Sequence, residues 1–376
     1  MAEPSIVLDP NGDLLIIVSA PTGAFAIWDE PHGTSATQPR DNEDDQEKGD
    51  DEVAEAKDVM KALDTSSGTG DDDGNAPGNE LRIKASSRHL ALASQRFGRM
   101  LANSWPDLAV VDPEKGLRHW TTDAVDLAAF AIVMDIVHGR NRGVPRAVDL
   151  DTLAKIAVIV DDLQCHEAVE VFADMWIRAL EPSASVAKLS YSRELVLWTL
   201  VASVFHHAEI FRECTRIAIR NSTGPMPSLE LPIRGKVIDT VESWRLELID
   251  SIIASVYDLI DRLRDGKTSY SFECESMSLG GLIKQIYSCY LLYPRPSRPY
   301  AGLSVSTMIS LVRSFRTPKF PPMSLVFNEY DDDCGGGSGP RECGFETFLT
   351  PEMNALEARI KGLDLENDLG YAREGA

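Results

Sequence analysis

The chain has 376 residues, of which 43% are hydrophobic and 26% charged, and this composition is ordinary for a protein that buries a core. Its 59 acidic and 37 basic residues leave a net charge of −22, which opposes attraction to phosphate backbones and argues against nucleic acid as a direct partner. No apolar run reaches the ~18 residues of a membrane span, and the N-terminus lacks the basic and apolar regions of a signal peptide. We therefore expect an intracellular protein, in the cytoplasm, the nucleus or both, without a membrane partner.

The first predicted elements are strands. "GDLLIIVS" (12–19) is a β-rich apolar run that follows a turn signal, and "GAFAIW" (23–28) extends it or pairs with it. "LRIK" (81–84) alternates apolar and basic residues, which is typical of a half-buried strand. "SIVL" (5–8) has the composition to add one short strand.

Residues 29–80, between these strands, form an acidic insertion with 17 acids and four bases. So much charge and so few apolar groups predict a disordered segment. Within it, "VAEAKDVMKAL" carries an apolar stripe at helical spacing, and this stripe is either a docking helix for a partner or part of a solvated tether. The tether is favoured, because a single helix this short is marginal in water.

Two short helices are predicted directly after the third strand. Ser86 or Ser87 caps the first, a second begins near Ser94, and "WPD" (105–107) ends it. "GLRHWTT" (116–122) is the next candidate strand.

A buried helix is predicted to follow, starting at Thr122 and Asp123 and ending at His138, which caps it before a glycine stop. Apolar residues surround this helix almost completely, so we expect it to lie at the centre of the core. The stretch 150–177 then gives two helices separated at Gln164 and Cys165.

The second half is predicted to be helical. Residues 190–330 contain several apolar stripes at helical spacing, including a long amphipathic helix over 235–267 that stops at Gly266. We expect a flexible loop at 331–349, a helix at 350–362 with Thr350 as cap and Pro351 in its first turn, and a tail at 363–376.

No chemistry-bearing constellation can be assembled from the sequence. The six cysteines form no C-x-x-C pair, so neither a disulfide framework nor a structural metal is indicated, and we expect them to be reduced and mostly buried. No nucleophile, base and orienting group fall into a recognisable pattern. We therefore expect no catalytic residue, no bound metal and no cofactor, and a protein that is not an enzyme.

The order of these elements, with the stretches "SSRHLALASQRFGRML" and "LDTLAKIAVIVDDLQCHEAVEVFADMWI", resembles a BTB/POZ domain of the type common in fungi. The resemblance covers 12–180 and implies an α+β fold, a small sheet with helical hairpins, in which "LRIK" pairs with "DLLIIVS" and 29–80 is an insertion between them. Loop closure entropy grows slowly with length, so such an insertion is tolerable. The all-α region after it is similar to the helical region that follows the domain in many such proteins.

The resemblance implies a protein-interaction function. In cullin-binding members a hydrophobic-x-Glu motif follows the second helix of the hairpin, and here "NSWPD" stands there, with aspartate in place of glutamate. The candidate partner-binding residues are therefore these five: Phe97, Met100, Leu101, Trp105 and Asp107.

Two functions follow. The first is an adaptor that recruits a protein partner to a cullin-based ubiquitin ligase, and the second is a scaffold or regulatory protein that works without ubiquitin. The sequence is also compatible with a homodimer. Few residues precede "GDLLIIVS", so a monomer and a dimer with a smaller interface than the family's strand-swapped one are both compatible with the sequence.

Overall fold

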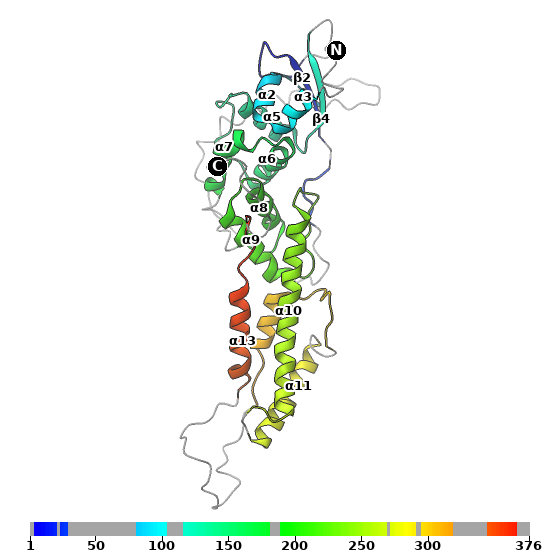
Figure 1. Ribbon diagram of the computed structural model, residues 1–376, viewed down its shortest axis with the longest axis vertical. Helices are drawn as coiled ribbons and strands as arrows, with labels where there is room; N and C mark the ends of the chain where they lie inside the picture. The colour runs from blue at the N-terminus through cyan, green and yellow to red at the C-terminus, as the bar shows by residue number, and fades with distance from the viewer. Residues whose placement is uncertain are drawn as a thin grey trace, which may run out of the picture. The chain divides into compact units, whose positions relative to one another are not determined.

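A computed structural model describes residues 4–20, 23–28, 80–103, 116–180, 189–268, 271–290, 295–318 and 344–366. They fall into two compact units. Unit 1 takes the described residues up to 180 together with 192–206 and 229–232, and unit 2 takes the remainder. Figure 1 shows the helices and strands of both. Within the described ranges, every helix is too short or too polar to cross a bilayer.

Unit 1 is built on one mixed sheet with the strand order β1-β3-β2-β4. Its strands are β1 (Ile6–Val7), β2 (Leu14–Ser19), β3 (Glu80–Ala85) and β4 (Arg118–Asp123). β2 pairs antiparallel with β3, so the predicted pairing across the insertion is confirmed. β1 and β4 run parallel to their neighbours, and the short strand expected within 5–8 is present as β1.

The described residues of unit 1 also form six helices, and the unit is mixed α+β as predicted. They are α2 (Ser87–Ala93), α3 (Gln95–Ala102), α5 (Leu127–Val137), α6 (Leu150–Leu163), α7 (His166–Leu180) and α8 (Arg193–Val204). α5 contacts α2, α6 and α7, and six of its eleven residues are buried, as expected of a central helix. α8 is buried at every position from Leu195 to Val204 and contacts α6, so the core of unit 1 extends past the predicted end at 180.

Two sequence predictions in unit 1 are wrong. Residues 23–28 form no strand, because Arg193 of α8 holds this segment through the carbonyl oxygens of Phe25 and Ala26 at 3.1 and 2.8 Å. α5 starts at Leu127 rather than at 122–123, since β4 stays paired with β2 through Asp123. Its N-cap is Asp126, whose carboxylate accepts a hydrogen bond from the Ala129 N–H at 2.9 Å.

Unit 2 is all helical in the described residues and is organised around its longest helix. Its helices are α9 (Ala208–Asn221), α10 (Gly235–Arg264), α11 (Phe272–Cys289), α12 (Val305–Arg313) and α13 (Phe345–Arg359). α10 contacts all four others, and Figure 1 shows it beside α12 and α13. Its stop at Gly266 is confirmed, because that residue has φ +65°, which a glycine adopts without strain.

The C-terminal part of unit 2 departs from the sequence predictions. α13 begins at Phe345 and not at Thr350, so 344–349, predicted to be loop, belong to the helix and its cap, and Pro351 lies inside the helix. Phe345 and Leu349 are buried in the first turns, and this burial offsets the hydrogen bond that the proline removes. The predicted tail also starts inside the fold, because Leu363 and Leu365 are buried.

Candidate protein-interaction surface

The turn between α2 and α3 is fixed by one serine. The backbone N–H of Ser94 donates to the carbonyl oxygen of Leu90 at 2.8 Å, and its hydroxyl accepts from the Phe97 N–H at 2.9 Å. The same hydroxyl donates to the Leu163 carbonyl oxygen of α6 at 2.5 Å. Ser94 therefore ends one helix, caps the next and ties both to a third, and the predicted start of the second helix near Ser94 is confirmed.

The first turn of α3 lies against the C-terminal end of α6. The Gln95 N–H donates to the Gln164 carbonyl oxygen at 3.2 Å, Arg96 forms an ion pair with Asp162, and the Arg99 guanidinium donates to the Gln164 side chain. The guanidinium groups of Arg96 and Arg99 are also favourable at this position, because the C-terminal end of α6 carries a partial negative charge. α3 is therefore held in place before any partner binds.

The structure separates the five sequence-predicted binding residues. Phe97 has no exposed surface and packs edge-on against Trp120 with 5.1 Å between ring centroids. Met100 is also buried, and Leu101 is half-buried. Trp105 and Asp107 lie outside the described residues. Phe97 and Met100 are core residues here, so they act on a partner only by positioning α3.

The stretch 80–103, which contains β3, α2 and α3, is basic in an otherwise acidic chain. Residues 80–103 contain one acid, Glu80, and five bases that are exposed or half-buried: Arg82, Lys84, Arg88, Arg96 and Arg99. The exposed side of α3 adds Gln95, Ala102 and Asn103. Arg96 is already paired with Asp162, so an acidic group of a partner that docks on the helices would meet Arg88 and Arg99.

The start of α2 is secured by two groups from outside the helix. The Asp13 carboxylate accepts the Ser87 N–H at 2.9 Å and the Ser87 hydroxyl at 2.7 Å. His138 accepts the Ser86 N–H on Nε2 at 3.1 Å, while its Nδ1 lies 2.8 Å from the Met134 carbonyl oxygen. These bonds require a neutral ring with the proton on Nδ1. The predicted capping role of His138 is confirmed, and it also joins α5 to α2.

His138 makes the stability of unit 1 depend on pH. Burial lowers its pKa, and the nearby His89 ring, 5.4 Å away, lowers it as well, whereas the hydrogen bond to Met134 and the charge of Asp9 raise it. The balance leaves the pKa of His138 below its usual value. The unfolded chain therefore binds more protons as the pH falls through about 6.5, and stability that is complete at higher pH is lost.

We expect unit 1 to open more readily at pH 5.5 than at pH 7.5, and His138→Gln to flatten this dependence. Hydrogen–deuterium exchange of α2 and α5 peptides, corrected for the intrinsic pH effect, measures it. His119→Gln in β4 is the matched control and should keep the wild-type dependence. Equal pH dependence in wild type and His138→Gln would show that another group is responsible.

In the described residues, the side chains that could ligate a metal ion are scattered. No group of three or more His, Cys, Asp or Glu side chains there is arranged to hold a metal ion. Of the four described cysteines, Cys165 and Cys214 are buried, and Cys274 and Cys289 are half-buried. Burial raises the pKa of Cys165 to about 12, which keeps its thiol protonated and unreactive.

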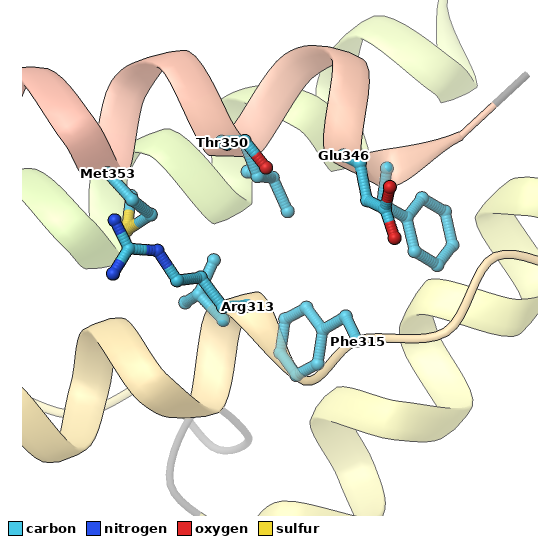
Figure 2. A pocket seen from close by; sticks show the side chains of 8 residues that line it. Arg313, Phe315, Glu346, Thr350 and Met353 are labelled. Atoms are coloured by element: carbon cyan, nitrogen blue, oxygen red, sulfur yellow. The ribbon is translucent and has the colours of Figure 1, made fainter. Parts of the chain in front are cut away.

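A small cleft lies in unit 2 between α12 and α13, as Figure 2 shows. It has a cavity volume of about 10 Å³, and its lining combines apolar side chains with Arg313, Glu346 and Thr350. The Arg313 guanidinium donates to Asn354 and Glu357 at 2.6 and 2.7 Å. The cavity volume of the cleft is far below the roughly 300–1,000 Å³ of typical small-molecule sites.

Comparison of the chain with protein-family models, with curated proteins and with solved structures finds no match. The resemblance to a BTB/POZ domain therefore rests on the residue patterns and on the order of elements alone. The anchoring of α3 on α6 is independent of that resemblance.

Proposed function

We propose that this chain is a protein-interaction adaptor in which unit 1 is a BTB/POZ domain that brings a partner to a cullin-based ubiquitin ligase in the cytoplasm or nucleus. The observation that supports it most is α3, whose first turn is anchored on α6 while its far side is exposed. The order of hairpin β2–β3, helices α2–α3, strand β4, helix α5 and helices α6–α7 is what the resemblance implies.

Anchoring matters for binding, because a surface that is already ordered loses little conformational entropy when a partner docks. α3 and its C-cap expose Arg99, Ala102 and Asn103. The stretch "SWPD" (104–107), which holds Trp105 and Asp107, directly follows Asn103 in the sequence. In this proposal α3 and the residues that follow it contact the cullin, and unit 2 contacts the second protein.

A ubiquitin-independent scaffold is the alternative, and one observation favours it. Asp107 stands where cullin-binding members of the family have glutamate, and Pro106 precedes it. The aspartate side chain is one methylene shorter, and proline fixes the backbone and lacks an N–H donor. Both differences weaken a contact made by that motif, and they leave self-association and partner recruitment as the function.

Affinity purification of the full-length protein from its own cells, with mass spectrometry of bound proteins, tests the proposal. The variants are Trp105→Ala/Asp107→Lys and Arg99→Glu, and the matched control is Val171→Lys, an exposed position of α7. We expect a cullin with wild type and control, and at least tenfold less with both variants.

Three other outcomes of this experiment would contradict part or all of the proposal. Partners that persist in all proteins without any cullin would replace the adaptor by the scaffold. Retention of a cullin by both variants would move the contact away from α3. Absence of any specific partner would contradict both functions.

A further inference from the structure

Residues 23–28 of unit 1 form a strap that is held by α8 and takes no part in the sheet. Arg193, the first residue of α8, donates from Nε to the Ala26 carbonyl oxygen at 2.8 Å and from Nη2 to the Phe25 carbonyl oxygen at 3.1 Å. Almost every peptide segment offers such carbonyl oxygens. Arg193 therefore binds the backbone of the strap and not its particular sequence.

The guanidinium that holds the strap is itself oriented by α6. The Asp151 carboxylate accepts from Nη1 of Arg193 at 2.7 Å and from Nη2 at 2.9 Å, which is the paired geometry that suits these two planar groups. One turn further along α6, Lys155 donates to the Asp126 carboxylate at 2.9 Å. The strap belongs to neither ion pair, so both pairs orient the site for any backbone that lies there.

Two residues of the strap show which side chains this site accepts. Nζ of Lys155 lies 5.7 Å from the centre of the Phe25 ring, within the range of a cation–π contact. Ala26 is only 6% exposed, whereas Ile27 beside it is 62% exposed and directed to solvent. The site thus holds an aromatic residue followed by a small one.

The strap occupies this site with a strained backbone. Ala26 has φ +51°, in the left-handed region, where the Cβ atom of any residue other than glycine is crowded. Glycine adopts the same angle without this strain. The ion pairs that hold the strap are partly exposed and Phe25 is only half-buried, so the strap is attached weakly. Strain that is kept at a weakly attached segment points to a role in function.

We propose that the strap occupies, in cis, a peptide-binding site of unit 1, and that an extended segment of a partner protein with an aromatic residue followed by glycine displaces it. The partner's ring takes the place of Phe25 beside Lys155, and its carbonyl oxygens accept from Arg193. Its glycine takes the left-handed conformation without the strain of Ala26. The site lies in unit 1 but does not depend on the proposed contact between α3 and a cullin.

Hydrogen–deuterium exchange of the full-length protein tests whether the strap opens by itself. We expect the amides of 24–28 to be less protected than those of α6 and α8, because local opening leaves the core closed. Ala26→Gly should raise the protection of the strap at least twofold, since it removes the strain. Ala24→Gly, at an exposed position of the same strap, is the matched control and should not raise it. A strap as strongly protected as α6 would overturn the proposal.

Fluorescence anisotropy tests the site with a labelled peptide of residues 23–28 that carries Ala26→Gly. Full-length Phe25→Ala should bind it at least tenfold more tightly than wild type, because the intact strap competes at an effective concentration of ~1 mM or more. Adding Arg193→Lys, which keeps the charge beside Asp151 but loses the fork of donors, should weaken this binding at least tenfold. Adding Arg178→Lys, on the exposed side of α7, is the matched control and should leave it unchanged.

Each of the other results would contradict the proposal. Absence of binding to wild type and Phe25→Ala up to ~1 mM peptide would exclude the site. Equal binding by these two proteins would show that the strap does not occupy it, and binding that survives Arg193→Lys would place the contact elsewhere. A peptide with the natural Ala26 that binds as tightly as the Ala26→Gly peptide would exclude the preference for glycine. Unchanged exchange of α6 in every variant shows that a loss of binding does not come from unfolding.

Discussion

Replacing Arg245 with methionine is expected to destabilise unit 2 by about 3–5 kcal/mol. The Arg245 side chain is fully buried in α10 and donates twice to the Glu242 carboxylate, at 2.7 Å each. It also donates to the carbonyl oxygens of Pro299, Tyr300 and Leu303, at 2.9, 3.3 and 2.8 Å. One guanidinium thus holds the whole segment before α12 against α10.

The cost arises from the groups left behind. Methionine has a similar length but no donor, so three carbonyl oxygens and a carboxylate lose their partner away from water. Hydrogen–deuterium exchange should show faster exchange in α10 and at 295–304, and urea unfolding should shift to lower concentration.

Arg262→Met is the matched control on the same helix. Arg262 is partly exposed and lies over the Phe348 ring, 4.8 Å away, so its loss should cost less than about 1 kcal/mol. An equal effect of both changes would contradict the role of Arg245.

The second large effect is expected from Phe97→Ala, which should destabilise unit 1 by about 3–5 kcal/mol. Phe97 is completely buried and packs on Trp120, so alanine leaves a cavity between α3 and the sheet. Exchange of β4 and α3 peptides should rise together. Leu92→Ala, on the exposed side of α2, should change neither.

This prediction also bears on partner binding. If Phe97→Ala abolishes binding, exchange of α3 should rise in the same protein, because the loss comes through the fold. Trp105→Ala/Asp107→Lys should abolish binding without raising exchange in β4. Loss of binding in Phe97→Ala with unchanged exchange would mean that Phe97 contacts the partner itself.

The sequence predicted correctly those helix starts and ends that are set by one residue and its nearest neighbours in the chain. The sequence predicts a helix start near Ser94, a cap at His138, a stop at Gly266 and a break at Gln164, and each of these is a property of short-range backbone geometry. The β2–β3 pairing was predicted from the resemblance, because the residues of one strand do not specify which strand it pairs with.

The errors came from long-range contacts. Asp123 reads as a helix start, yet it is drawn into β4 by pairing with Ser19. Pro351 reads as a first-turn residue, yet burial of Phe345 and Leu349 extends α13 ahead of it. In the candidate site, Phe97 and Met100 were assigned to a partner because a helix pattern does not tell which apolar side faces the core of its own chain.

The strand pairing across the insertion has a consequence for how unit 1 folds. Leu14 pairs with Ala85 and Ser19 with Glu80, so the sheet closes a loop of roughly sixty residues, at about 2 kcal/mol more entropy than a tight turn would cost. Contacts between α2 and α3, and between α6 and α7, are local and form without that cost. The helical hairpins are therefore expected to form early, and the central strand β2 to join last, which makes the rate of folding sensitive to the length of the insertion.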